Sequence, residues 1–240
     1  MATSKTERDF TDHFEVYLAK RDGVDKLLKI SRYASKIVIS SAILPENSPL
    51  NQRLKSFESS VGVSRKAFRL GKFIQDLNAL KKVAFDSRAG KLGIVAYGGE
   101  GIYYFVEQFL WLSKAGLISG HYSKNLQKVS AWAEFIGYIG SISLKTLDLK
   151  AINEEELGLR AALEELKLQG KEFDEEAEKL QRLEEKKLMK RLSIVQDFAD
   201  ALMALGDIKD GRGFLAKPVF VAFAGLLSAI ISTHKNWVSC

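Results

Sequence analysis

Few stretches of this chain could form a β-strand, and this scarcity constrains its fold more than any other feature. Alternating apolar and polar residues, the pattern of a half-buried strand, are rare, whereas Leu, Ile, Val, Ala and Phe dominate. Only three prolines interrupt the 240 residues. The sequence therefore predicts an all-α fold with long amphipathic helices.

Composition limits how much of the chain we expect to find in a membrane. A hydrophobic share of 46% beside a charged share of 28% is ordinary for a soluble domain. A protein made mostly of membrane spans should be more apolar and less charged. We therefore expect any membrane attachment to depend on a few segments.

Turn residues divide the N-terminal half into helical segments. Asp22-Gly23 separates a predicted helix at about residues 7–20 from one at about 24–44, and Pro45 to Pro49 ends the second helix because proline is not tolerated inside one. A long helical pattern follows from residue 50 to 80. The next part of the chain then predicts a glycine-rich break at 90–101 and two mostly apolar helices at 102–118 and 126–149.

Charge and helical pattern divide the chain into three regions. Residues 1–150 form an N-terminal helical region. Residues 151–190 hold twelve acidic and eight basic side chains, and we interpret them as a charged helical spacer with possible breaks at Gly158 and Gly170; a regulatory segment is the alternative. Residues 191–240 hold a further helix and the best candidate for a membrane span.

The segment from Phe214 to Thr233 is long and apolar enough to cross a membrane. Its 20 residues match a hydrocarbon thickness of about 30 Å, and its one charged residue, Lys217, lies near its start. A buried core helix is the competing interpretation. The stretch from Leu92 to Leu112 is apolar too, but Glu100 and Glu107 disfavour a lone lipid-facing helix there. We therefore predict a membrane-associated helical bundle with at least one transmembrane helix.

Small residues at four-residue spacing mark two places where helix backbones could approach closely. One is the stripe of Ala133, Gly137 and Ser141, and the other is the pair Gly225 and Ala229 inside the candidate span. We predict all five as helix-packing positions. Packing inside a soluble bundle would use the same pattern.

Residues 63–80 carry the most informative pattern in the chain. At about 100° per residue, apolar residues fall on one helix face and mostly basic residues on the other. The apolar face comprises Val63, Ala67, Leu70, Phe73, Ile74, Leu77 and Leu80; Arg65, Arg69, Lys72 and Asp76 lie opposite, with Lys66 on a boundary and Phe68 on the flank. Such a helix suits a membrane surface, where apolar side chains wedge between acyl chains while Arg and Lys meet phosphates. A core-facing helix with a basic back fits the same pattern.

The wider basic stretch favours a polyanionic partner, because residues 53–91 hold ten basic and three acidic side chains. The aromatic-rich strand motif of an RNA-binding module is missing, so we expect lipid and no nucleic acid. A phosphate-binding loop and a nucleophile elbow are also missing. His13, His121 and His234 stand far apart, without a second ligand at metal spacing. We predict no enzyme, catalytic residue, metal or cofactor.

Four blocks spread over nearly the whole chain resemble a single family. They are Asp22 to Lys36, Ser64 to Phe73 with its Arg-Leu-Gly-Lys core, Tyr103-Tyr104-Phe105 with Trp111-Leu112, and Ala224 to Ala229 with Trp237 beyond it. Together they resemble the peroxin-11 family, and most of all its plant members. The resemblance implies a protein of the peroxisomal membrane that elongates or tubulates this membrane and promotes peroxisome proliferation and fission.

The resemblance also implies partners and site residues. The partners would be an anionic phospholipid membrane, further copies of the chain and related family members, a fission adaptor and a dynamin-like GTPase. Residues 1–150 would be the membrane-remodelling region. Lipid phosphates would be held by Arg65, Lys66, Arg69 and Lys72, and the side chains that insert or pack would be Phe68, Leu70, Phe73, Ile74 and Leu77. Family members are usually described with two membrane spans, whereas this sequence shows one convincing span.

Two other functions stay open at the level of sequence. Glu100, Glu107 and Glu134 lie in otherwise apolar helices, which would suit a membrane pore for small metabolites. The other alternative is a soluble helical scaffold whose acidic 153–190 region recruits basic partners.

Overall fold

A computed structural model of the chain describes residues 9–170 and 173–240, which form helices joined by short turns. No strand occurs within these two ranges, so the predicted all-α fold is confirmed. The α-helices are α1 (Phe10–Ala19), α2 (Arg21–Ser40), α3 (Pro49–Phe68), α4 (Phe73–Leu80), α5 (Arg88–Lys114), α6 (Ser123–Leu168), α7 (Asp174–Ile208) and α8 (Pro218–Val238).

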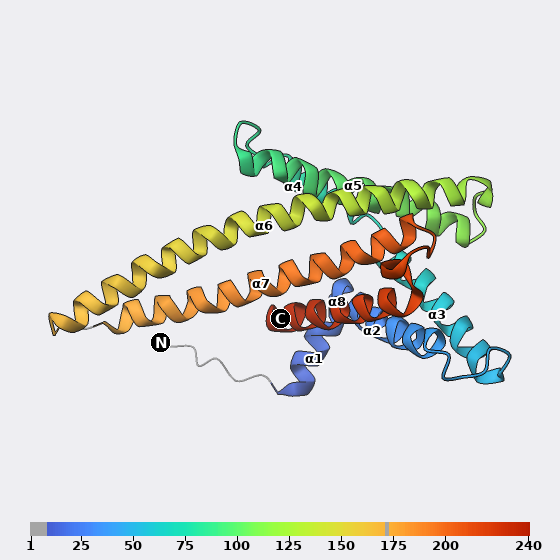
Figure 1. Ribbon diagram of the computed structural model, residues 1–240, viewed down its shortest axis with the longest axis horizontal. Helices are drawn as coiled ribbons and strands as arrows, with labels where there is room; N and C mark the ends of the chain where they lie inside the picture. Colours follow the sequence, from blue (N-terminus) through green and yellow to red (C-terminus); the bar gives the residue numbers. More distant parts are fainter. Residues whose placement is uncertain (1–8, 171–172) are drawn as a thin grey trace.

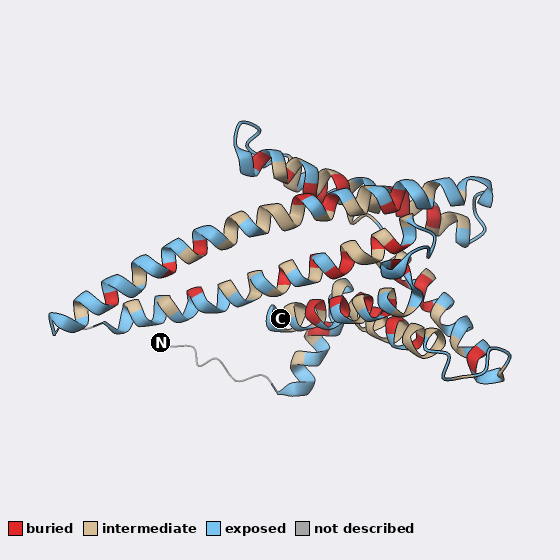
Figure 2. Ribbon diagram, viewed as in Figure 1, coloured by how far each residue is buried: buried red, intermediate tan, exposed pale blue. Residues whose placement is uncertain are grey.

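The helices gather into a bundle at one end of an elongated molecule and leave a long arm at the other end (Figure 1). Within the bundle α6, α7 and α8 lie side by side. α5 packs on the outer edge of this layer at α6, α4 packs on α5, and α2 packs on α8 and α3. The distal parts of α6 and α7 continue as a two-helix arm, residues 152–170 and 173–190. Figure 2 shows that buried residues concentrate in the bundle and that the arm is mostly exposed.

Helix starts follow the capping signals in the sequence. Ser48 precedes α3 and its Oγ accepts a hydrogen bond from the backbone N–H of Asn51, while Pro49 occupies the first turn. Ser87 caps α5 in the same way through the N–H of Gly90, at 2.8 Å. The break predicted between the second and third helices is therefore confirmed, although α2 already ends at Ser40.

The first turn of the chain lies slightly earlier than predicted. The predicted 7–20 helix corresponds to α1, and its residues 7 and 8 lie outside the described ranges. After α1 the chain turns at Lys20 rather than at Asp22-Gly23. Gly23 belongs to the first turn of α2. A Cβ atom there would lie 2.0 Å from the carbonyl oxygen of Tyr17, so glycine is required for close packing of α1 on α2.

Two helices continue through glycines that the sequence predicts as breaks. α5 runs unbroken through residues 90–101, and α6 continues through Gly158. Gly170, the other predicted break, does separate the arm helices and has a φ of +62°, a conformation that glycine adopts without strain. The candidate span is confirmed as a helix, but α8 begins at Pro218 rather than at residue 214, because a separate short turn at Phe214–Ala216 precedes it.

The glycines of α5 allow its backbone to touch that of α6. A Cβ atom on Gly99 would lie 2.5 Å from the Cα of Gly137, and one on Gly140 would lie 2.5 Å from the backbone nitrogen of Ala96. Both distances are far below van der Waals contact. The run of glycines is therefore a packing surface, and the surrounding helical contacts offset its low helix propensity.

This close approach predicts opposite effects for two adjacent glycines. Gly99→Ala should destabilise the protein by about 1–3 kcal/mol, because the added methyl group forces the two backbones apart. Gly98→Ala is the matched control, since a Cβ atom there meets nothing within 4 Å, and alanine should raise helix stability by up to about 1 kcal/mol. Thermal unfolding of both variants in detergent measures the difference, and equal midpoints would contradict the packing described.

Candidate functional site

The predicted 63–80 helix is divided in two, which corrects the single amphipathic helix expected from the sequence. α3 ends at Phe68 and α4 begins at Phe73, with a tight turn between them. Gly71 has a φ of +72°, and its N–H donates to Oε1 of Gln108 on α5, at 3.2 Å. Arg21 supports the turn from the other side by donating to the carbonyl oxygen of Leu70, at 2.7 Å. Tertiary hydrogen bonds therefore hold a bend that helical periodicity alone does not reveal.

Two of the predicted phosphate-binding residues point into the bundle toward Asp25 of α2. Nε of Arg65 donates to Oδ1 of Asp25 at 2.9 Å, and the arginine is only 3% exposed. Arg69 donates to the hydroxyl of Tyr103 at 2.7 Å, and its Nε lies 3.6 Å from the same Asp25 oxygen. Burial alone would raise the pKa of Asp25, but Arg69 and Arg65 hold it well below its usual range. Asp25 therefore stays ionised and anchors both arginines.

The other two predicted phosphate-binding residues also meet carboxylates. Lys66 donates to both carboxylate oxygens of Glu107 on α5, and Nζ of Lys72 lies 3.3 Å from Oδ1 of Asp22 on α2. Asp22 is the most exposed of these acidic partners, with 42% of its side chain accessible. All four basic residues thus face other helices of the same chain.

The apolar residues of this segment have the opposite orientation. Leu70, Ile74 and Leu77 are exposed, the last two by 52% and 48%. Phe73 packs edge-to-face on Phe105 of α5, with ring centroids 5.4 Å apart. Phe68 is half-buried at the end of α3. The apolar side of the segment therefore faces outward, the reverse of a helix that covers the core of a water-soluble protein.

A polar cavity of about 500 Å³ lies behind these residues. Its lining comes from α2 through α8 and mixes both signs of charge; among the residues are Lys29, Arg65, Glu100, Glu107, Glu134 and Asp200. Lys29 crosses the interior from α2, donating to Asp200 of α7 at 2.8 Å and to Ser228 of α8 at 2.6 Å. A bundle with charged groups inside and apolar groups outside follows from these placements.

Asp76 is the acidic residue of the 63–80 segment, and it also turns inward. It is 7% exposed, and its Oδ2 lacks a hydrogen-bond partner among the described residues. Burial raises the pKa of Asp76 to about 6, while nearby Lys72 acts in the opposite direction. Asp76 is therefore the member of this segment whose charge responds to mildly acidic pH.

Sequence reasoning found the glutamates of the cavity but missed the acids and bases of α2 and α7. Asp25, Lys29, Arg32 and Lys36 recur at spacings of four, three and four residues, which places them on one face of α2. Nε of Arg32 donates to Glu58 of α3 at 2.7 Å. A stripe of charged residues along one face of this amphipathic helix was the available signal for a polar interior.

The predicted helix-packing residues lie at three different contacts. Ala133 and Gly137 face Gly99 of α5, while Ser141 donates from Oγ to Oδ2 of Asp197 on α7, at 2.7 Å. In α8, Ala229 is fully buried, and a Cβ atom on Gly225 would lie 2.3 Å from the ring of Tyr33 on α2. These small residues therefore pack against helices of their own chain.

The fold and its interior define a class of protein, the membrane-associated helical bundle. In the part of the chain that the structure describes, α8 is the helix long and apolar enough to cross a membrane. Residues 11–237 match the family Peroxisomal biogenesis factor 11 (PEX11). The chain belongs to this family.

Similar proteins cover nearly the full length of the chain. It is 58% identical to Peroxisomal membrane protein 11A of Arabidopsis thaliana, over 99% of this chain and 96% of that protein. It is 53% identical to Peroxisomal membrane protein 11-3 of Oryza sativa subsp. japonica, over 97% and 91% of the two chains, and 45% identical to Peroxisomal membrane protein 11-2 of the same rice, over the same shares. No solved structure matches the chain.

These relationships confirm the predicted family and its plant character. The chain is a non-enzymatic protein of the peroxisomal membrane that takes part in peroxisome biogenesis. Because the relatives are peroxisomal membrane proteins, the alternative of a soluble helical scaffold is set aside.

Proposed function

We propose that this protein elongates the peroxisomal membrane by inserting the exposed apolar side of residues 70–77 into one leaflet. The observation that carries the proposal is the outward orientation of Leu70, Ile74 and Leu77. The turn and the short helix that hold these residues are themselves attached to α5, through Gln108 and Phe105. Apolar side chains inserted at headgroup depth spread one leaflet relative to the other and so favour curvature. α8 holds the protein in the membrane while this happens.

Lipid phosphates are the proposed ligands of Arg65, Lys66, Arg69 and Lys72. Each of these residues is engaged by an acidic or phenolic group of the chain itself. A phosphate that takes the place of such a group keeps the cation paired, so the exchange needs only a small difference in free energy. Lys72 is the first candidate for exchange, because its partner Asp22 is itself partly exposed.

Self-association, binding of related family members, and recruitment of a fission adaptor and a dynamin-like GTPase complete the proposed function. These roles would couple elongation to peroxisome proliferation and fission. Family membership is what supports them.

The wedge predicts that outward apolar residues of α4 are needed for elongation. Ile74→Ser combined with Leu77→Ser should abolish most elongation of anionic vesicles by the full-length protein, because each side chain contributes about 1.5–3 kcal/mol when it leaves water. Leu157→Ser combined with Leu168→Ser is the matched control, since these arm residues are 69% and 89% exposed. Light or electron microscopy of the vesicles measures tubule length. Full elongation by the α4 variant would overturn the wedge.

The exchange of partners predicts that removing a competing carboxylate strengthens lipid binding. Asp22→Asn should increase binding to anionic vesicles by about fivefold more than a neutralised acid elsewhere, because it releases Lys72 to meet a lipid phosphate, and one basic charge at the membrane surface is worth about 1 kcal/mol. Asp12→Asn in α1 is the control, because Asp12 is exposed and the change in net charge is the same. Vesicle flotation at two salt concentrations measures both variants. Equal affinities for the two would show that Lys72 does not meet lipid phosphate.

A pore for small metabolites is the second candidate function, and the polar cavity favours it. Glu100, Glu107 and Glu134 all line this cavity. Glu100→Gln combined with Glu134→Gln should lower the conductance of the purified protein in planar bilayers, while Glu164→Gln on the exposed arm should leave it unchanged. A wild-type protein without conductance would exclude this candidate.

A further inference from the structure

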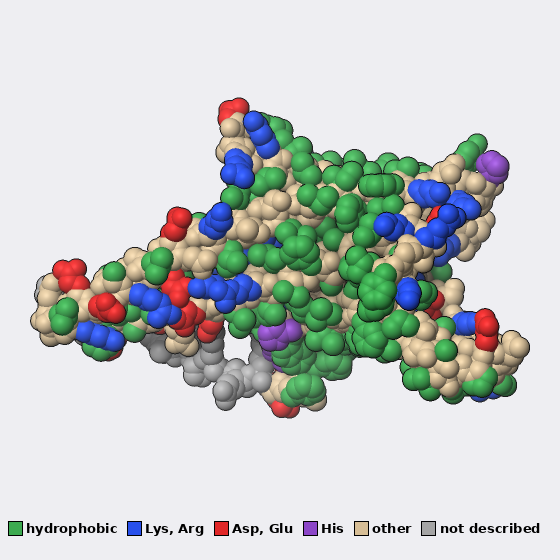
Figure 3. All heavy atoms as spheres, in the orientation of Figure 1, with side chains coloured by type: hydrophobic (Ala, Val, Ile, Leu, Met, Phe, Trp, Pro, Cys, Tyr) green, Lys and Arg blue, Asp and Glu red, His purple; other side chains and the backbone are tan. Residues whose placement is uncertain are grey.

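Large apolar side chains form a continuous layer on the outside of the bundle. We call this layer the outer belt. Its members are between 39% and 58% exposed and come from four helices: Val95, Ile102, Phe105 and Phe109 of α5, Val129, Trp132, Ile136 and Ile139 of α6, Val195 and Phe198 of α7, and Phe220, Phe223, Leu227 and Ile230 of α8. Figure 3 shows one side of it as a broad group of hydrophobic spheres across the centre of the molecule. Monomeric soluble proteins rarely expose an apolar surface of this extent.

Each stripe of the outer belt follows one face of its helix. The belt residues of α6 are three, four and three positions apart, and so are those of α8. In α5 the same spacing runs from Val95 through Gly98 to Ile102, with a glycine at the position where a large side chain would otherwise stand. The small residues that contact other helices lie on different faces, including Gly137 and Ala229. The belt is thus an outer surface of the bundle and not an unfilled part of its core.

The charged residues of the same stretches point the other way. Between Leu92 and Leu112 the acids of α5 are Glu100 and Glu107, and both line the internal cavity. In α7, Asp197 is 4% exposed and accepts hydrogen bonds from Ser141 and Lys145. Charged residues inside a membrane are tolerated where they face the bundle interior and are paired.

The same arrangement holds for α7 and α8 where they meet α2. Asp200 is 4% exposed and receives a hydrogen bond from Lys29. Ser228 of α8 is fully buried beside the same lysine. These polar groups of α7 and α8 are therefore paired inside the bundle and do not face the belt.

The length of the belt matches a bilayer. The stretch Leu92–Leu112 has 21 residues and spans about 31 Å as a helix, against about 30 Å of hydrocarbon. Residues 129–147 of α6 span about 28 Å between Lys128 and Asp148. The corresponding part of α7, residues 192–206, is shorter at about 22 Å, a difference that local thinning of the bilayer accommodates.

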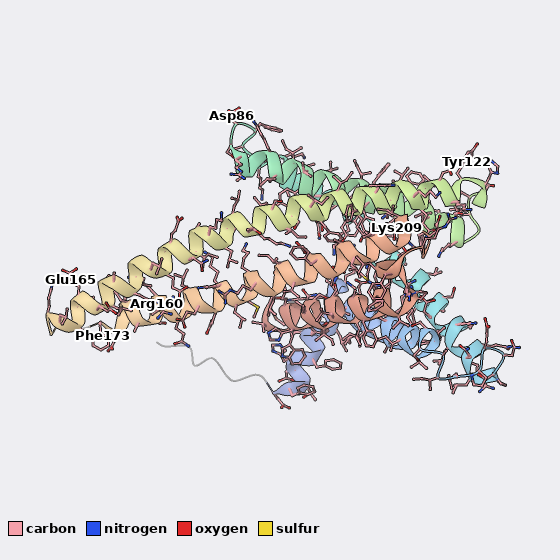
Figure 4. All side chains as sticks on the ribbon, in the orientation of Figure 1. Asp86, Tyr122, Arg160, Glu165, Phe173 and Lys209 are labelled. Carbon is pink, nitrogen blue, oxygen red and sulfur yellow. The ribbon has the colours of Figure 1, made fainter. Side chains whose placement is uncertain are left out.

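Charged surfaces lie beyond both ends of the belt. Figure 3 shows them on the arm and at the opposite end of the bundle. Figure 4 marks these ends: Glu165 and Phe173 lie toward the tip of the arm, whereas Tyr122 and Lys209 both lie on the side of the bundle away from the arm. The end of α8 that carries the C-terminus faces the arm side (Figure 1).

We infer that the outer belt is covered by lipid acyl chains, so that α5, the first part of α6, the last part of α7 and α8 enter the bilayer together. The choice of acyl chains over a protein partner rests on α8. This helix is the candidate span of a peroxisomal membrane protein, and its own stripe is continuous with the other three through the packing of α7 between α6 and α8. The arm and the C-terminus then lie on one side of the membrane, and residues 115–122 and 209–217 on the other.

Hydropathy averaged along a helix identifies α8 as a candidate span but not α5, α6 or α7. The charged residues on the inward faces of these three helices lower the average, although their outward faces are apolar. The inference does not depend on membrane elongation. It concerns where the bundle lies, and it holds whether or not residues 70–77 act as a wedge.

Quenching of tryptophan fluorescence by lipids brominated in mid-chain tests the inference in the full-length protein. The chain has three tryptophans, Trp111, Trp132 and Trp237, and Trp132 is a member of the outer belt at 52% exposure. The variant Trp111→Phe with Trp237→Phe keeps Trp132 alone. In vesicles of brominated phospholipid it should lose most of its emission, and dissolved iodide should leave its emission unchanged.

Matched variants in a background without tryptophan separate the alternatives. Phe198→Trp on α7 and Phe105→Trp on α5 should be quenched by brominated lipid, as should Phe223→Trp on α8. Leu157→Trp lies on the same helix as Trp132 but in the arm, and it should respond to iodide alone. Circular dichroism checks that each variant keeps its helix content, and any variant that fails is replaced by tryptophan at the next belt position of the same helix. Lipid quenching at residue 223 without quenching at residues 105, 132 and 198 would overturn the inference and leave a single span.

Discussion

Asp25 determines which way the N-terminal helices face. A carboxylate that is only 1% exposed is costly to bury unless cations accompany it, and here Arg65 and Arg69 do so. Because both arginines belong to the α3–α4 segment, satisfying Asp25 turns the basic side of that segment inward and its apolar side outward. Lys29 and Asp200 impose the same orientation on α7 and α8. The polar interior and the apolar exterior are consequences of one set of buried ion pairs.

Helical content, the C-terminal span and the family could all be predicted from the sequence, because each depends on local pattern. Periodicity also identified the two faces of residues 63–80. It could not identify which face would be inside, since a basic face meets either lipid phosphate or buried carboxylates. It could not find the bend at Gly71 either, because that bend depends on Gln108, which is 37 positions away along the chain.

The glycine-rich stretch of α5 shows the same limit. Helix propensity predicts a break there, and the prediction is wrong because Gly99 and its neighbours let α5 touch α6 at Gly137. Propensity describes an isolated helix, whereas the stability of α5 comes from its partner. The charged stripe of α2 indicated a polar interior, but only to a reader who expects the charged face of an amphipathic helix to point into the bundle.

The proposed wedge and the inferred bilayer position support one mechanical picture. Phe73 packs on Phe105, which belongs to the outer belt, and Gly71 donates to Gln108, so the 70–77 segment starts beside the second half of the Leu92–Leu112 stretch and extends the belt sideways. From Asp76, which lies against Gly101, to Val83, which lies near Gly93, the chain follows the first half of α5, so α4 adds most of its apolar volume on the arm side of the bilayer. A bundle that occupies more area in one leaflet than in the other bends the membrane around it. Elongation would then follow from the shape of the embedded bundle, and exchange of carboxylate for lipid phosphate at Lys72 would adjust how deeply α4 inserts.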